Sequence, residues 1–373
     1  MNAGLDHAGV TSVPETPEVI WVYRRSRRQW LDEWRRGDRS GEFFYSMPTL
    51  GRRYRVGFVE DERRHPFLRA WWPMEWILAR RFGMGFALDL VLRNVGVLRR
   101  ARVVVSTVDS CGLPLALLKN LGLLRARLIY ISQGLSDRVA AYGARRWLSR
   151  RYRNLLLGVD ELVVLSGGAR DSLATWLGVP ADRIRVLPFG TDCEFWRNTA
   201  LSGERGGRVI SVGSDSGRDY PTLLAAAADL PLHIVTRQPL TLDRHPNLIH
   251  STNHSPIELR DIYSRAAFVV IPLLDRSQPS GQSATLQAMA CGKAVIVTRT
   301  RGWWGEPFVR DGETCVLVPP GDVSALRAAM RRFWSEPELC RRIGQKARET
   351  VVSHFSEDQM AAALDRLIGA HVC

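Results

Sequence analysis

The sequence has no uninterrupted apolar run that approaches the roughly 18 to 20 residues needed to cross a bilayer. Residues 1–18 also lack the basic and then apolar pattern of a secretory signal, so we expect a cytoplasmic protein. The six cysteines show no C-x-x-C spacing. This scatter is typical of reduced, packed thiols, and we expect neither disulfides nor a metal site.

Lysine is scarce as well, so the positive charge is carried almost entirely by arginine; the three lysines are Lys119, Lys293 and Lys346. The net charge of +14 is uneven, because residues 1–200 hold 32 basic and 20 acidic side chains, whereas residues 201–373 hold 20 and 18. A basic first half is compatible with a solvated surface, with peripheral contact to an anionic membrane face, or with nucleic acid. We expect no nucleic-acid partner, since no motif for one is present.

The length of 373 residues predicts two domains. The polar, glycine-containing stretch 198–207 separates two similar halves, and we place the linker there. The first domain then spans residues 1–197 and the second spans 208–373, with terminal helices that pack back toward the first.

Both halves alternate short apolar runs with helical patterns. In the first half, strands are expected at 19–25, 55–60, 103–107, 127–132, 161–165 and 184–190, and amphipathic helices between Trp71 and Leu98. A β/α series of this kind predicts a parallel sheet covered on both faces. The fold class is therefore α/β, with two Rossmann-like, doubly wound domains that face each other across a cleft, a favoured place for ligands.

The stretch from Gln278 to Thr298 combines a loop, a helix that Gly292 ends, and a buried strand. In a parallel sheet this order places the start of the helix at the carboxyl edge of strand 268–272. The start of the helix is small and polar, and its unsatisfied N–H groups suit a phosphate; its residues are Ser280, Gly281, Gln282 and Ser283. The same residues also fit a helix start that is merely capped.

Polar side chains likewise follow two strands of the first half. Asp109 and Ser110 come after the strand that ends at Thr107, in a loop before a helix expected over 113–121, and Ser132 and Gln133 end the next strand. The carboxyl ends of parallel strands share one edge of the sheet, so these groups are expected at one site.

Four segments together resemble the GT-B glycosyltransferases, in particular the retaining family 4. They are 161–196 (ELVVLSGGAR to CEFW), 209–230 (VISVGSDSGRDY to AADL), 255–298 (SPIELRD to AVIVT) and 311–348 (DGETCVLVPP to QKAR). The resemblance implies a hexosyltransferase that moves a sugar from a nucleoside diphosphate, UDP- or GDP-linked, to an acceptor hydroxyl. It also implies retention at the anomeric carbon, no cofactor and no required metal, with the donor on the second domain.

The resemblance further implies specific donor contacts. A basic pair follows the first strand of the second domain in the family. Here the loop that starts at Gly213 has Ser214 in the first position and Arg218 as the candidate for the second. The two family glutamates are replaced by Gln278 in the loop and Gln287 on the helix. An amide can still bind hydroxyls, but it carries no charge; nearby Asp275 is a possible source of one.

For the acceptor, Gln133 stands where family members often have a histidine, and Ser110 and Ser132 are the other polar candidates. Asp109 is our candidate for binding or deprotonating the acceptor hydroxyl. Sugar, lipid and secondary-metabolite acceptors all stay open. Two alternatives remain: a GT-B sugar-nucleotide epimerase or hydrolase, and a non-catalytic GT-B binding subunit that has lost its carboxylates.

Overall fold

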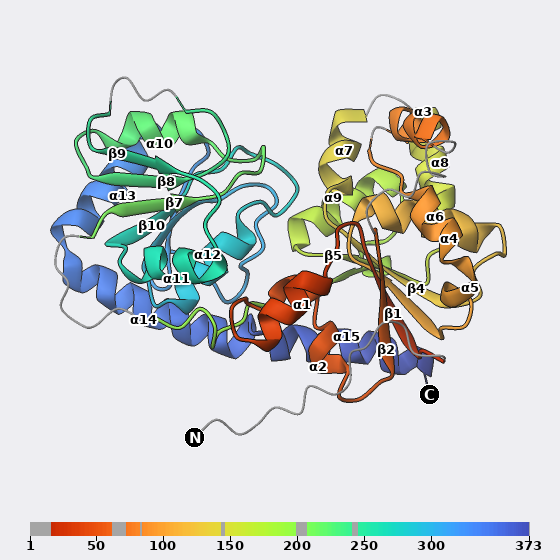
Figure 1. Ribbon diagram of the computed structural model, residues 1–373. Coiled ribbons are helices and arrows are strands. Elements are labelled where there is room, and N and C mark those ends of the chain that lie inside the picture. The colour runs from red at the N-terminus through yellow and green to blue at the C-terminus, as the bar shows by residue number, and fades with distance from the viewer. Residues whose placement is uncertain are drawn as a thin grey trace. The chain divides into compact units, whose positions relative to one another are not determined.

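The computed structural model describes residues 16–61, 72–82, 84–142, 146–198, 207–240 and 245–372. The chain divides into two compact units, which Figure 1 shows with the chain coloured from end to end. Unit 1 comprises residues 1–36, 43–187 and 360–373, and unit 2 comprises residues 37–42 and 188–359. Most of the expected linker, 198–207, lies outside the described residues.

Unit 1 is built on a six-stranded parallel sheet in the order β2-β1-β3-β4-β5-β6. The strands are β1 (Val19–Tyr23), β2 (Val56–Glu60), β3 (Val103–Ser106), β4 (Arg127–Ser132), β5 (Glu161–Val164) and β6 (Ile184–Val186). Every residue of β1 is buried, which explains its continuous apolar sequence. We expected the last strand to reach Gly190, but it ends at Val186, because Pro188 has no N–H for the ladder.

The sheet of unit 1 packs against apolar side chains of α4, α6, α8 and α9. The helices are α1 (Arg28–Arg35), η1 (Glu42–Phe44), α2 (Met47–Leu50), α3 (Trp72–Phe82), α4 (Leu88–Arg93), α5 (Val95–Leu98), α6 (Asp109–Asn120), α7 (Leu135–Tyr142), α8 (Arg146–Leu157), α9 (Gly167–Leu177) and η3 (Ala181–Arg183). The expected placement of Asp109 and Ser110 in a loop is wrong, because α6 already begins at Asp109. Pro114 cannot donate to the Ser110 carbonyl, which accepts from Ala87 N at 2.8 Å instead.

Unit 2 holds a second six-stranded parallel sheet, in the order β12-β11-β10-β7-β8-β9. Its strands are β7 (Val209–Val212), β8 (Leu232–Val235), β9 (Leu248–Ser251), β10 (Phe268–Ile271), β11 (Val295–Thr298) and β12 (Val316–Val318). Its helices are α10 (Tyr220–Ala227), α11 (Pro256–Ser264), α12 (Gln282–Ala290), α13 (Val323–Ser335) and α14 (Pro337–His354). The last helix, α15 (Glu357–Val372), begins in unit 2 and continues into unit 1.

Two Rossmann-like parallel-sheet units are thus confirmed. The strand order of each sheet reverses at one point, between β1 and β3 in unit 1 and between β7 and β10 in unit 2. Loops that leave the carboxyl ends of strands on either side of such a point are where open α/β sheets bind ligands. Among the described residues, no helix has both the length and the apolar character of a membrane span.

Candidate functional site

The reversal point of unit 2 is flanked by the loops that follow β7 and β10, residues 213–219 and 272–281. Backbone hydrogen bonds join these loops: Asp219 N donates to Pro272 O at 3.1 Å, and Leu274 N donates to Gly217 O at 2.9 Å. The sequence-predicted donor residues on both loops therefore belong to one structural feature.

The start of α12 lies at the end of the second loop, as the sequence predicts. Gly281 is the N-cap residue, with φ of 72°, and makes no side-chain cap hydrogen bond. A glycine at this position supplies no side-chain acceptor to the first-turn N–H groups, which point toward the loop and carry the positive end of the helix dipole. The helix is followed by Gly292 with φ of 71° and then by β11, so the predicted loop, helix and strand are confirmed.

Arg218 is buried beside this helix start, with 4% of its side chain exposed. Its Nε donates to Asp215 Oδ2 at 2.9 Å, whereas its buried Nη1 has no hydrogen-bond partner within the described part of the chain. Two glycines leave room for the guanidinium: a Cβ on Gly213 would collide with it, and one on Gly281 would come within 3.1 Å of Nη1. The site thus holds a desolvated cation whose Nη1 can donate a hydrogen bond to a ligand.

Replacing Gly281 by alanine is expected to lower the free energy of unfolding by about 1–2 kcal/mol, because φ of 72° is strained for a residue with a Cβ. The new Cβ would also lie 2.7 Å from Ile271 Cγ2. Urea unfolding measures the loss. Gly292→Ala is the matched control: it has the same φ but no atom within 4 Å of the added Cβ, so an equal loss in both variants would show that space around Gly281 is unimportant.

Gln287 lies on α12 and is 5% exposed. Its Nε2 donates to Glu42 Oε1 at 2.9 Å, and Trp196 Nε1 donates to the same oxygen at 2.9 Å. The resemblance implies a carboxylate at position 287, and here an amide occupies that position with the carboxylate of Glu42 bound to it. Sequence reasoning missed Glu42 and Trp196. Glu42 lies in no motif and is 245 positions from Gln287, and Trp196, although it ends the resembling segment 161–196, was not assigned a role.

The buried Glu42 belongs to a group of acids with Asp192 and Glu357, which are half-buried. Asp192 accepts from Gly41 N at 3.2 Å and from Phe195 N at 2.9 Å, and a Cβ on Gly41 would lie 2.6 Å from Glu357 Oε1. Burial raises the pKa of all three carboxyls, and the charge of Asp192 further raises the pKa of Glu42 and of Glu357. Segment 37–42 is therefore held in unit 2 by groups that favour protonation.

Gln278 lies in the loop before α12, where its carbonyl accepts from Ser280 N at 2.8 Å. The Ser280 side chain faces the other loop, since a Cβ on Gly217 would lie 2.5 Å from its Oγ. Asp275, considered from the sequence as a source of negative charge, forms an ion pair with Arg301 at 2.9 Å. The charge of Asp275 is therefore offset by an arginine from the segment that follows β11.

In unit 1, the structure brings Asp109, Ser132 and Gln133 together. Asp109 Oδ1 accepts from Tyr130 Oη at 2.8 Å, and Oδ2 accepts from the backbone N of Gln133 at 3.2 Å and of Gly134 at 2.6 Å. Burial raises the pKa of Asp109, although hydrogen bonds from these donors and from Ser132 lower it in part. The carboxylate therefore joins the start of α6 to the end of β4.

Two other polar groups of unit 1 have different surroundings. The Gln133 side chain donates from Nε2 to Thr107 O and to Tyr45 Oη, so it links the ends of β3 and β4 to a residue that the sequence did not single out. Ser110 instead faces the segment before α4, where its carbonyl accepts from Ala87 and its Cβ lies 3.2 Å from the position of a Cβ on Gly85.

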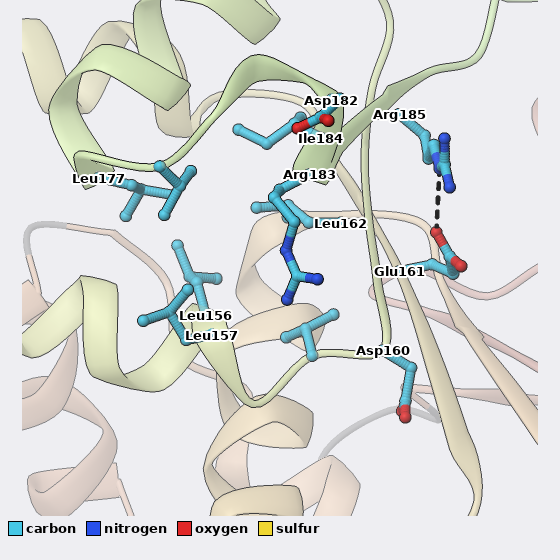
Figure 2. Close-up of a pocket in the computed structure, with 12 residues that line it drawn as sticks. Leu156, Leu157, Asp160, Glu161, Leu162, Leu177, Asp182, Arg183, Ile184 and Arg185 are labelled. Carbon is cyan, nitrogen blue, oxygen red and sulfur yellow. Dashed lines mark ion pairs between the residues drawn. The ribbon is translucent and has the colours of Figure 1, made fainter.

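A pocket of unit 1 lies where β5 and β6 begin, at the edge of the sheet opposite to these groups. Figure 2 shows Glu161 and Arg185 on its wall, joined as an ion pair at 3.5 Å. Asp160, also on the wall, pairs with Lys119 at 2.6 Å and with Arg127 at 2.8 Å. Parallel sheets bind ligands at the other edge, so we do not assign the active site to this pocket.

Comparison with protein families gives two matches along the chain. Residues 43–195 match the model described as Glycosyltransferase Family 4, and residues 218–336 match the model described as Glycosyl transferases group 1. The chain is 27% identical over 259 residues to an MMP alpha-(1->4)-mannosyltransferase of Mycolicibacterium hassiacum, covering 61% of this chain and 60% of that protein. It is also 27% identical over 254 residues to glycogen synthase of Mycobacterium tuberculosis, covering 63% and 58%.

Solved structures with the same fold cover nearly the whole chain. Sucrose-phosphate synthase from Thermosynechococcus elongatus superposes with a TM-score of 0.69 at 16% identity, covering 94% of this chain and 98% of that one. Anabaena HepE, solved in complex with UDP-glucose, gives a TM-score of 0.68 at 14% identity, covering 94% and 99%. At this identity the structural likeness establishes the fold alone.

Proposed function

Because the chain belongs to the GT-B glycosyltransferases, we propose that it transfers a hexose from a nucleoside diphosphate to an acceptor hydroxyl. Retention at the anomeric carbon and independence of a metal ion are part of the proposal. The bond between the anomeric carbon and the diphosphate breaks, its electron pair leaves with the diphosphate, and the acceptor oxygen forms the new bond on the same face of the sugar. The acceptor hydroxyl loses its proton.

The observation that carries this proposal is the position of the buried Arg218 guanidinium beside the start of α12, where the N-cap residue is Gly281. The negative charge on a leaving diphosphate grows as the bond breaks, so a site that stabilises it needs fixed donors in place beforehand. Arg218 Nη1 and the first-turn N–H groups of α12 are such donors. These donors also supply positive charge, which a divalent cation provides at other diphosphate sites.

Gln287 with Glu42 supports binding of the donor's hydroxyl groups, since an amide and a carboxylate can both accept from them. Asp109 is the proposed group for the acceptor hydroxyl, because a carboxyl whose pKa is raised by burial takes up a proton more readily than an exposed one.

The test is a panel of UDP- and GDP-linked hexoses, measured first by thermal unfolding and then by turnover. One nucleotide is expected to raise the unfolding midpoint, since a ligand that binds only the native state stabilises it. Transfer should continue in EDTA, and the product should keep the donor's anomeric configuration by NMR. No response to any diphosphonucleotide would contradict the proposal.

The same panel separates the two alternatives. An epimerase or hydrolase would alter the donor without any acceptor, which NMR of the donor alone detects. A binding subunit would be stabilised by a nucleotide yet turn over no donor with any acceptor fraction, whether sugar, lipid or secondary metabolite.

We also propose that unit 1 makes peripheral contact with an anionic membrane through α3. Three large apolar side chains of this helix are solvent-exposed, Met74 at 46%, Trp76 at 52% and Ile77 at 55%. Arg80 lies over the Trp76 ring, with its Cζ 5.1 Å from the centroid. Aromatic, aliphatic and arginine side chains on one helix are typical of binding at a lipid interface.

Replacing Trp76 and Ile77 by glutamate is expected to lower partitioning onto phosphatidylglycerol vesicles by roughly tenfold or more, since each loses about 1.5–3 kcal/mol of apolar burial in the lipid. Vesicle sedimentation measures the bound fraction. The control is Leu121→Glu with Leu123→Glu, at two apolar residues that are also exposed on unit 1. Equal binding of both variants would argue against α3 as the contact.

A further inference from the structure

Arg27 follows β1, on one side of the strand-order reversal in unit 1, and immediately precedes α1. Its guanidinium Cζ lies 5.2 Å from the centroid of the Tyr23 ring and 4.2 Å from that of Trp30. These contacts hold the cation against two aromatic rings at the edge of the sheet where ligands are expected.

The guanidinium carries two buried nitrogens, Nε and Nη1, that have no hydrogen-bond partner among the described residues. The nearby carboxylate of Glu60 does not satisfy them. Its Oε1 accepts from Ser26 Oγ at 3.2 Å and pairs with Arg28 Nε at 3.2 Å, and its Oε2 accepts from the backbone N of Arg27. Burial lowers the pKa of Arg27, which is the expected effect on a desolvated cation.

Buried polar atoms without a hydrogen-bond partner are costly, so these two nitrogens of a half-buried arginine call for a functional explanation. The neighbouring groups point to one. The Tyr23 ring that Arg27 contacts carries a hydroxyl that donates to Phe44 O at 2.7 Å, next to Tyr45. The Tyr45 hydroxyl is in turn bound by the Gln133 side chain, which also donates to Thr107 O at the end of β3. Burial raises the pKa of Tyr45 to about 12, so this hydroxyl keeps its proton at neutral pH.

The backbone at Tyr45 is itself unusual. Tyr45 and Ser46 are consecutive non-glycine residues with φ of 51° and 60°, a conformation that costs free energy and persists only where the surroundings enforce it. It holds the Tyr45 side chain beside Gln133. A cation from the segment between β1 and α1 and a phenol from the 43–46 segment thus adjoin the Asp109 network at the ends of β3 and β4.

We propose that Arg27, with Tyr45 beside it, binds a phosphate group on the acceptor. The acceptor class is then a phosphorylated sugar or a phosphate-bearing lipid, and Asp109 lies on the same edge of the sheet for the hydroxyl. A phosphate has the negative charge and the several acceptor oxygens that could satisfy the unpaired guanidinium nitrogens. This assignment names the acceptor for the proposed transfer and rests on it.

The test measures phosphate binding directly, without a donor. Arg218→Ala serves as the background, so that inorganic phosphate cannot report on the α12 site. Calorimetric titration should show binding to this background, and Arg27→Met added to it should weaken the affinity by about tenfold or more, the effect of losing hydrogen bonds from a charged group. Arg25→Met, an exposed arginine two residues away, should leave the affinity unchanged.

The stability of Arg27→Met separates a binding role from a structural one. The methionine keeps an apolar stem between the two rings and removes an unsatisfied charge, so the unfolding midpoint should stay within about 4 °C of the parent. Unchanged phosphate affinity in Arg27→Met would overturn the proposal, whatever happens to the stability of the variant.

Failure of the proposed transferase function would give a different result in nucleotide binding. In the otherwise wild-type protein, Arg27→Met should bind the donor nucleotide as the parent does; absence of nucleotide binding in both would contradict the transferase proposal and leave the phosphate result intact. Glucose 6-phosphate and phosphatidylglycerol vesicles distinguish a phosphorylated sugar from a phosphate-bearing lipid. One of them should bind more tightly than inorganic phosphate, and this gain should depend on Arg27. Absence of the gain with both would count against a phosphate on the acceptor.

Discussion

Replacing Arg218 by alanine is expected to lower kcat/KM by roughly 10²- to 10³-fold, the usual effect of removing one donor that stabilises developing charge. The guanidinium is desolvated, and its Nη1 has no partner in the described part of the chain, so its interaction with a diphosphate would be strong and would grow as the bond breaks. Steady-state kinetics with the donor identified by the nucleotide panel measures the loss.

Two variants make this prediction specific. Arg218→Lys keeps the charge but not the planar donor geometry, so it should retain an intermediate rate. Arg237 is an exposed arginine in the loop after β8, and its backbone N donates to Ser214 Oγ at 2.9 Å. Arg237→Ala keeps this backbone contact and should turn over donor at the wild-type rate. Equal losses in Arg218→Ala and Arg237→Ala would indicate a general charge effect, and full activity in Arg218→Ala would remove the residue from the site.

Loss of fold must be separated from loss of function in Arg218→Ala. The substitution leaves Asp215 without its ion-pair partner, but the Asp215 side chain is 47% exposed, so water can replace much of that interaction. The unfolding midpoint should therefore change little. A large drop in the midpoint would show that the arginine is structural, and the double variant Arg218→Ala with Asp215→Ala would then recover stability without activity.

The fold could be predicted because its signals are local. The apolar run of β1 and the order of loop, helix and strand around α12 each lie within a short stretch, and Gly292 marks the helix end as expected. The helix was expected from residue 113, whereas α6 begins at Asp109 and includes Pro114, because Ala87 supplies the hydrogen bond to the Ser110 carbonyl that the proline cannot. That donor comes from another segment, and nothing in the local sequence reveals it.

The candidate site was predictable in part for the same reason. Arg218 and Gly281 lie in motifs, but the burial of the arginine depends on both loops and on the space that Gly213 leaves. The Glu42–Gln287 contact joins residues 245 positions apart, and Arg27 is one of four arginines within residues 24–28. Only the packing of Tyr23 and Trp30 around it distinguishes Arg27 from its neighbours.

Replacing Glu42 by glutamine is expected to stabilise the protein at neutral pH, on the order of 1–3 kcal/mol, because it removes a buried charge. The amide oxygen can still accept from Trp196 Nε1 and Gln287 Nε2, which both donate to Glu42 Oε1. Its amino group would replace Oε2, which is buried without a partner among the described residues. Urea unfolding from pH 5 to pH 8 measures the difference.

The pH dependence follows from the raised pKa of Glu42. An acid whose pKa is higher in the folded than in the unfolded protein binds protons more tightly in the native state. Stability is therefore greatest below the unfolded-state pKa and falls as the pH rises through the folded-state value. Glu42→Gln should remove this part of the decline, so its advantage shrinks at low pH. Asp192 and Glu357 also have raised pKa values and should leave a residual slope of the same sign.

Glu42→Ala distinguishes the charge from the acceptor. It removes both, so Trp196 Nε1 and Gln287 Nε2 lose their acceptor, and each unsatisfied donor costs about 1–3 kcal/mol. The alanine variant should therefore be less stable than the glutamine variant at every pH, by an amount that does not vary with pH. Glu338→Gln, at a side chain that is 81% exposed in the same unit, should follow the wild-type curve. The stability curve of Glu42→Gln could instead run parallel to that of the wild type from pH 5 to pH 8. In that case the pKa of Glu42 does not change on folding, and its charge does not limit the stability of segment 37–42 in unit 2.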